Sequence, residues 1–383
     1  MRQKAFIIGL SALAAALFAG CGKGDDDYAT ARSLMNSGKY SAAEEYFEKA
    51  AANNNSDAGF YVDAGLNDIE LQKYSAAEEN FRHALSLGDR IEDAYRGIGI
   101  CCYEQGRYAE AIEAFDSAIA QVELSVGPAE YDILKYRGDC EDRLGRYEKA
   151  LSTYNALIEL GIDRTEQYLK EGAVYLALKD SESACKCFDK ALEIRGNDVQ
   201  VYFSIYNSCC DAGLTDTGMK YLSRALEVDG NSNQAHLWRG RIYYLMGNNS
   251  AALTELSYPL EDNDHEAALY AAFCYEAMGD YDSAVQLYYE ELSRVNDPVM
   301  INYLAICLSA QGDYNKAWNV VHSAISQYPD CECIQQLRWN EIVLYERMGY
   351  YPSAYTHLLE YKELYPNDPA VKQELEFLLM KQS

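Results

Sequence analysis

The residues of this chain that could do chemistry are its 12 cysteines, its five histidines and its 60 Asp and Glu side chains. Zinc sites need Cys or His ligands at short, regular spacings, and the sequence contains neither C-x-x-C nor H-x-x-x-H. It also lacks G-x-S-x-G, G-x-G-x-x-G and the P-loop, the motifs of nucleophilic hydrolases and nucleotide-binding loops. The sequence therefore predicts no catalytic residue, no metal ligand and no cofactor.

One cysteine lies where a lipid could be attached. Two basic residues precede a 14-residue apolar run, the build of an export signal and too short to span a bilayer. The run ends in Phe18-Ala19-Gly20-Cys21, which resembles the lipobox of bacterial lipoproteins, with Phe18 in place of the usual Leu. The resemblance implies a signal peptide over residues 1–20, lipid attachment (a diacylglyceryl group carrying chains such as palmitate) at Cys21, and a tether over residues 21–27.

A motif with a period of about 34 residues fills the rest of the chain. Each copy of the motif can be numbered from one reference position. Gly occurs two residues before this position in eight of the ten copies, and a small residue occurs nine residues before it in eight copies. Ala occurs three residues after it in nine copies, and an aromatic or aliphatic residue seven after it in all ten. The ten reference positions are Tyr40, Tyr74, Tyr108, Tyr147, Ser181, Thr215, Asn249, Tyr281, Tyr314 and Tyr351. Because Gly ends a helix and small residues let two helices approach closely, the motif predicts ten helix-turn-helix units.

This motif resembles the tetratricopeptide repeat, whose consensus has the same small, Gly-x-Tyr-x-x-Ala and aromatic positions. The resemblance implies an all-α fold, an α-solenoid in which about ten units over residues 28–368 coil into a right-handed superhelix. We expect Pro259 to end the second helix of its unit early. We expect residues 369–383 to form a solvating helix that caps the array, with Val371, Leu375, Leu378 and Leu379 on its buried face.

The repeat also favours a structural role for the eleven remaining cysteines. Four of them share one position, two residues after the small residue: Cys101, Cys140, Cys274 and Cys307. Cys behaves as a small apolar residue, so a recurring position indicates packing. Cys331 and Cys333 follow Pro329 in a predicted turn, and we expect this pair to be exposed.

In the tetratricopeptide repeat family, first helices line a concave groove that binds peptides or partner helices. Transferring the groove positions to this chain gives nine candidate contacts: Tyr28, Arg96, Tyr103, Phe203, Asn207, Tyr244, Phe273, Asn302 and Trp339. Aromatic side chains anchor a partner with little loss of entropy, and Asn can pair with a bound backbone. The alternative is that several of these aromatic residues pack between units and never contact a ligand.

Charge narrows the choice of partner. The net charge of −27, which becomes −29 without Arg2 and Lys4 of the signal peptide, disfavours nucleic acid and anionic lipid surfaces. We therefore expect a non-catalytic scaffold, exported and lipid-anchored at the bacterial cell envelope, that binds a protein or peptide and contacts the membrane only through its lipid. The alternatives are a glycan- or peptidoglycan-binding tether, and a helical glycan-active enzyme, whose closed barrel would not keep a constant 34-residue period.

Overall fold

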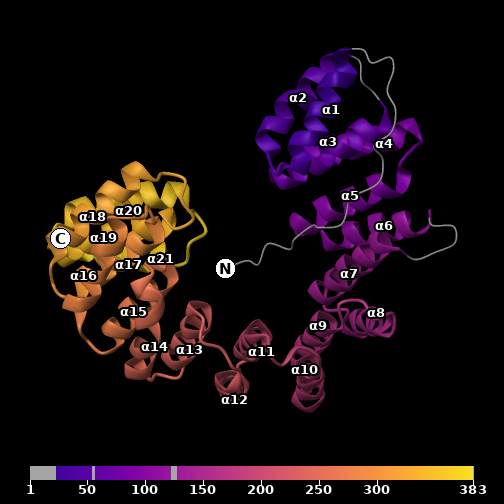
Figure 1. Cartoon of the computed structure of the whole chain (residues 1–383). Helices are drawn as coiled ribbons and strands as arrows, with labels where there is room; N and C mark the ends of the chain where they lie inside the picture. The colour runs from indigo at the N-terminus through magenta and orange to yellow at the C-terminus, as the bar shows by residue number, and fades with distance from the viewer. Residues whose placement is uncertain (1–22, 54–56, 122–126, 383) are drawn as a thin grey trace. The chain divides into compact units, whose positions relative to one another are not determined.

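The computed structural model describes residues 23–53, 57–121 and 127–382, and these residues form helices without β-strands (Figure 1). This confirms the expected all-α solenoid. The signal peptide and Cys21 lie outside the described residues. The chain divides into two compact units, residues 1–218 and residues 219–383.

The helices follow one another as pairs. The first unit contains α1 Lys23–Asn36, α2 Tyr40–Ala52, α3 Ala58–Glu70, α4 Tyr74–Leu87, α5 Ile91–Glu104, α6 Tyr108–Ile119, α7 Pro128–Arg143, α8 Tyr147–Glu159, α9 Arg164–Ala177, α10 Ser181–Arg195 and α11 Val199–Asp211. Next comes α12 Thr215–Arg224, which contains the boundary between the units and continues into the 3-10 turn η1 Ala225–Glu227. The second unit contains α13 Asn233–Leu245, α14 Asn249–Glu261, α15 His265–Ala277, α16 Tyr281–Leu292, α17 Pro298–Ala310, α18 Tyr314–Gln327, α19 Ile334–Arg347, α20 Tyr351–Leu364 and α21 Ala370–Gln382.

The turn inside each helix pair has the same backbone conformation. All ten reference positions are the first residue of the second helix of their pair. The Gly two residues before has a positive φ in all eight copies that carry it, from +70° at Gly145 to +85° at Gly312. Gln72 and Lys179, which replace this Gly, keep the conformation with φ of +59° and +64°. The left-handed turn is therefore imposed by the fold even where the side chain disfavours it.

Replacing Gln72 with Gly is expected to raise the free energy of unfolding of the surrounding helices by about 1 kcal/mol, because Gly adopts this φ without steric cost. Hydrogen exchange of the amides in α3 and α4 measures the change. The matched control is Gly106→Ala, at the equivalent position with φ of +75°, which should lose about the same amount. A loss of stability in Gln72→Gly would contradict this account of the turn.

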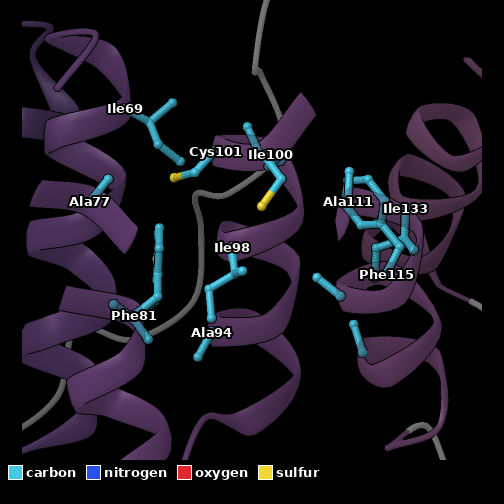
Figure 2. Close-up of a cluster of buried hydrophobic side chains, with 14 of the residues drawn as sticks. Ile69, Ala77, Phe81, Ala94, Ile98, Ile100, Cys101, Ala111, Phe115 and Ile133 are labelled. Atoms are coloured by element: carbon cyan, nitrogen blue, oxygen red, sulfur yellow. The ribbon is translucent and has the colours of Figure 1, made fainter. Parts of the chain in front are cut away.

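The small residue of the first helix lies against the aromatic ring of the second. A Cβ atom added to Gly172 would lie 2.2 Å from Cε1 of Phe188, and one added to Gly99 would lie 2.4 Å from Cε1 of Phe115. Figure 2 shows Phe81 and Phe115 in the core that these contacts build in the first unit. The close approach explains why this position is small, since a side chain there would displace a buried ring.

Burial confirms the packing role of the four recurring cysteines, each of which is at most 1% exposed. One of them, Cys101, lies inside the core of the first unit, as Figure 2 shows. The expectation for Cys331 and Cys333 is wrong in part. Cys331 is half-buried, but Cys333 is buried because it packs into the core of the second unit.

Asn67 occupies the same repeat position as these cysteines and is buried, yet neither of its side-chain amide atoms has a hydrogen-bond partner among the described residues. Val174 fills the equivalent position in α9. We expect Asn67→Val to stabilise the first unit by about 1 kcal/mol, because it removes an unsatisfied buried amide. The reciprocal control, Val174→Asn, should cost about 2 kcal/mol. Denaturant unfolding of both variants would measure the two effects. A change of the same sign in the free energy of unfolding of both variants would refute the explanation.

Two further expectations are wrong at particular residues. Pro259 does not end its helix early, because α14 continues to Glu261 and a proline in the last turn removes only one helical hydrogen bond. The C-terminal helix α21 buries Val371 and Leu378 against α20, as expected, but leaves Leu379 exposed. Among the described helices, none has the length and apolar character needed to cross a membrane.

Candidate functional site

On the first helices of the first unit, four basic side chains form ion pairs with acids of neighbouring repeats. Arg96 of α5 forms an ion pair with Asp132 of α7 and is buried. Lys135 Nζ of α7 lies 3.0 Å from Asp163 Oδ2, just before α9. Other pairs of this kind join Arg32 to Asp63 and Lys170 to Asp139. The charges therefore hold first helices together, and an anionic ligand would have to displace an internal carboxylate to reach Arg96.

The aromatic candidates of the first unit also pack internally. Tyr28 donates a hydrogen bond to Asp63 Oδ2 at 2.8 Å, and burial together with this carboxylate raises the pKa of Tyr28. The ring of Tyr103 lies 5.2 Å from that of Tyr136 on α7, and burial raises the pKa of Tyr103 to about 12. Phe203 is buried in α11.

Of the polar candidates in this unit, Asn207 on α11 is exposed. It is four residues after Phe203 in the same helix, so the two side chains lie on one face of α11. The structure thus leaves one polar side chain of the first-unit candidates exposed.

The second unit presents a group of half-buried aromatic rings on its first helices. The ring centre of Phe273 on α15 lies 5.9 Å from that of Tyr244 on α13 and 4.9 Å from that of Tyr303 on α17. Tyr270 contacts both Tyr244 and Phe273. The structure therefore brings together two predicted candidates, Tyr244 and Phe273, and adds Tyr270 and Tyr303 to them.

The next first helix, α17, has no charged residue along its 13 positions. Val299 and Ile306 on this helix are 39% and 44% exposed. Asn302 lies between them in sequence and accepts a 2.7 Å hydrogen bond from Asn340 of α19. Because a solvent-exposed helix normally carries charge on its outer face, an uncharged one with exposed Val and Ile is a candidate contact surface.

Trp339 adjoins Asn340 in α19, the helix that the Asn302–Asn340 hydrogen bond joins to α17. It is half-buried, with its ring centre 5.3 Å from that of Tyr361 on α20. We call Phe273, Tyr303, Val299, Ile306 and Trp339 together the apolar face of the second unit. Sequence reasoning did not find Val299 or Tyr303, although the absence of charge in residues 298–310 was a signal that could have found them.

Acidic side chains of α15 and α19 are engaged inside the second unit. Glu266, on α15, pairs with Arg241 at 2.9 Å, and Glu276 of the same helix accepts a hydrogen bond from Tyr288 at 2.5 Å. Glu346 is on α19 near Glu374, and burial and this second carboxylate raise the pKa of Glu346 to about 7. Burial likewise raises the pKa of Glu276. The raised pKa values favour the neutral forms of Glu276 and Glu346.

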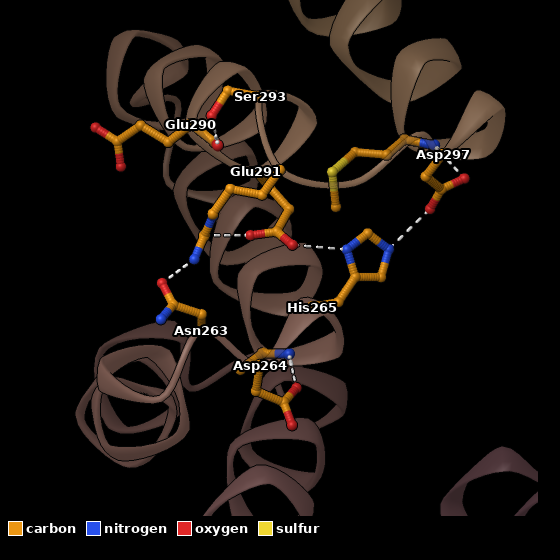
Figure 3. A network of polar contacts seen from close by, with 10 residues as sticks. Asn263, Asp264, His265, Glu290, Glu291, Ser293 and Asp297 are labelled. Carbon is orange, nitrogen blue, oxygen red and sulfur yellow. Dashed lines mark hydrogen bonds and ion pairs between the residues drawn. The ribbon is translucent and has the colours of Figure 1, made fainter.

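A buried polar network supports α17. Glu291 occurs at a repeat position where Ala is usual, and it is buried between the imidazole of His265, 2.9 Å away, and the guanidinium of Arg294 (Figure 3). The other ring nitrogen of His265 lies 2.9 Å from Asp297 Oδ2. Asp297 also caps α17, accepting a 2.8 Å hydrogen bond from the amide of Val299. The network thus ties the start of α17 to α15 and α16.

The stability of this region should depend on pH. Burial acts to lower the pKa of His265, but the hydrogen bonds and charges of Glu291 and Asp297 outweigh it and raise the pKa above 6.5. A raised pKa in the folded state stabilises the protein below the unfolded pKa, and this contribution is lost as pH rises through the folded value. We expect the stability difference between wild type and His265→Gln to be largest below about pH 6.5 and to shrink on the alkaline side.

Denaturant unfolding between pH 5.5 and about 9 would follow that difference. His83→Gln is the matched control, since His83 is exposed and its nearest carboxylate, that of Glu79, lies 4.0 Å away. A stability difference for His265→Gln that grows with pH would show that the network holds neutral histidine instead.

The described residues contain no group of three or more His, Cys, Asp or Glu side chains placed to hold one metal ion. Two shallow hollows on the surface of the described residues lie beside Glu78 and Arg107 and beside Tyr365 and Asp368. Neither coincides with the apolar face.

Comparisons with known proteins agree on the repeat. Models of the tetratricopeptide repeat match residues 28–66, 90–161, 168–198 and 266–294. A tetratricopeptide-repeat-containing protein of Methanocaldococcus jannaschii is 25% identical over 172 residues, which are 42% of this chain and 30% of that protein. The match thus spans less than a third of that relative's length.

Similar solved structures include a tetratricopeptide repeat protein of Parabacteroides merdae, 19% identical with a TM-score of 0.41, covering 66% of this chain and 98% of that one. Another is the C-terminal part of a repeat-containing protein of Cytophaga hutchinsonii, 19% identical with a TM-score of 0.45, covering 70% of this chain and 94% of that one.

Proposed function

We propose that this chain, which contains tetratricopeptide repeats, is a non-catalytic scaffold that binds a protein or peptide through the first helices of its second unit. The observation that carries the proposal is the uncharged helix α17, which exposes Val299 and Ile306 beside the aromatic rings of Phe273 and Tyr303. Such a surface suits an amphipathic helix or extended peptide, whose apolar side chains would cover it.

The charge of the whole chain indicates the charge of the partner. The chain carries −27. A partner with Lys or Arg beside its apolar side chains would therefore be attracted at long range. In the first unit, by contrast, two groove cations that could attract an acidic partner, Arg96 and Lys135, are already paired.

We also propose that the scaffold works at the outer side of a bacterial cytoplasmic membrane or in the periplasm, anchored by lipid on Cys21. The support is the basic start, the apolar run and the small residues before Cys21 in the sequence. The nine candidate groove residues stay predictions in this scheme. Three of them, Phe273, Asn302 and Trp339, lie on α15, α17 and α19, and Asn302 is buried.

Photo-crosslinking in the native host tests the binding surface. A photoreactive residue at Ile306 or Phe273 should give a discrete protein adduct identifiable by mass spectrometry. The matched control is Asn319, an exposed residue on α18 in the same repeat as Ile306. Adducts of equal yield from Asn319 would contradict the proposed surface, and attachment to wall glycan instead of protein would favour the peptidoglycan tether.

A further inference from the structure

Two thiols lie in contact at the start of α19. The Sγ atoms of Cys331 and Cys333 are 3.5 Å apart. A tight turn holds them there: the amide of Cys331 donates to the carbonyl of Tyr328 at 3.3 Å, and the amide of Ile334 donates to the carbonyl of Cys331 at 3.1 Å. Cys333 is the residue that immediately precedes α19. The backbone therefore presents both sulfurs on the same side of one short turn.

The two thiols differ in their access to solvent. Cys333 is 7% exposed and packs into the core that contains Met300, Leu304 and Leu337. Cys331 is half-buried at the edge of the same core. A reagent from solution therefore reaches Cys331 first, while Cys333 stays within reach of whatever bond Cys331 forms.

We propose that Cys331 and Cys333 are a redox-responsive pair that closes an intramolecular disulfide by exchange with a disulfide in the surrounding solution. In the first step the thiolate of Cys331 attacks the oxidant R–S–S–R, forming Cys331–S–S–R and releasing one thiol, R–SH, which takes up the proton lost by Cys331. In the second step the thiol of Cys333 loses its proton and attacks the Cys331 sulfur, releasing the second R–SH. The protein pair is oxidised by two electrons, and the oxidant is reduced to two thiols.

Closing this bond needs a small movement. A disulfide brings its sulfurs to about 2.05 Å, so the sulfurs must approach by about 1.5 Å. Burial and the neighbouring Cys331 thiol raise the pKa of Cys333 to about 12, which keeps its thiol protonated and unreactive until Cys331 has been modified. The turn leads into α19, the helix that carries Trp339. A change in the redox state of the pair would therefore alter the start of a helix that contributes to the apolar face.

Charge around the pair selects the oxidant. Asp330 and Glu332 flank Cys331 in sequence, and both are exposed. Their carboxylates repel an anionic disulfide such as oxidised glutathione and attract a cationic one such as cystamine. At low salt we expect cystamine to oxidise the pair about tenfold faster than oxidised glutathione, with a ratio that falls as ionic strength rises.

The test uses the full chain under native conditions, treated with each disulfide, alkylated and digested with trypsin. The tryptic peptide 317–338 contains Cys331 and Cys333 and no other cysteine. It should become lighter by two hydrogen atoms and resist alkylation. Cys185, which is also half-buried, lies in the separate tryptic peptide 180–186 and reports on the reactivity of a half-buried thiol outside the pair.

Single variants separate the roles of the two thiols. Cys333→Ser should trap the mixed disulfide on Cys331, whereas Cys331→Ser should leave Cys333 unmodified in the folded protein. An intramolecular disulfide that appears only after denaturation would overturn the proposal, as would equal modification of Cys333 in the Cys331→Ser variant. Asp330→Asn with Glu332→Gln should bring the two oxidants toward equal rates, and an unchanged rate ratio would refute the electrostatic selection.

Discussion

Replacing Ala150 with Asp is expected to unfold the helices around α8 while distant repeats remain folded. Ala150 is completely buried in α8, in a cluster with Tyr154 and with Val174 of α9. A carboxylate there would be desolvated without a partner, which costs roughly 3–5 kcal/mol. Because each repeat of a solenoid is stabilised mainly by its neighbours, the loss should stay local.

Hydrogen exchange read by mass spectrometry would show this. Amides of α7 to α10 should lose protection in Ala150→Asp, while those of α17 to α20 keep theirs. Ala156→Asp is the matched control, since it makes the same change at an exposed position of the same helix and should leave exchange nearly unaltered. Uniform loss of protection along the whole chain would show that the array unfolds as one cooperative body.

Replacing Cys21 with Ser is expected to move nearly all of the protein from the membrane fraction to the soluble fraction of the host. The reason is chemical: a serine hydroxyl cannot form the thioether that carries the lipid. Two acyl chains give stable anchoring, and an acidic chain of net charge −27 has no electrostatic attraction to an anionic membrane that could replace them.

Fractionation followed by immunoblotting measures the shift, and metabolic labelling with a fatty acid should lose its signal in the same variant. Cys185→Ser makes the identical chemical change inside the repeat array and should stay in the membrane fraction. Retention of Cys21→Ser at the membrane without label would remove the lipid anchor from the proposal but leave the binding surface untouched. The partner should then still crosslink to Ile306.

Local structure followed closely from the amino-acid pattern. The left-handed turn is determined by a few adjacent residues, which is why the Gly two residues before Tyr108 and its equivalents mark the start of eight of the ten second helices. The small residue and the ring that covers it, such as Gly99 and Phe115, are also close in sequence, so their contact repeats with the period. Pro259 shows the limit of such local reasoning, because its effect depended on how near the helix end it lay.

The candidate site was predictable only in part. Periodicity identified the first-helix positions of Tyr244 and Phe273, but it treated every such position alike. Burial of Arg96 beside Asp132 depends on two side chains 36 residues apart in sequence, and the exposure of Val299 depends on what α15 and α19 leave uncovered. Equivalent positions in different repeats therefore have different surroundings.

By itself, the sequence determined the class of fold, the ten helix pairs and the packing role of residues such as Cys101, because these follow from short-range backbone and steric constraints repeated along the chain. The tertiary structure alone decided which groove charges are paired internally, that Glu291 is paired with His265 and Arg294, and that Cys333 lies against Cys331 at the edge of a core. These outcomes depend on side chains from neighbouring repeats meeting in space, and a periodic pattern carries no information about which partner each side chain will meet.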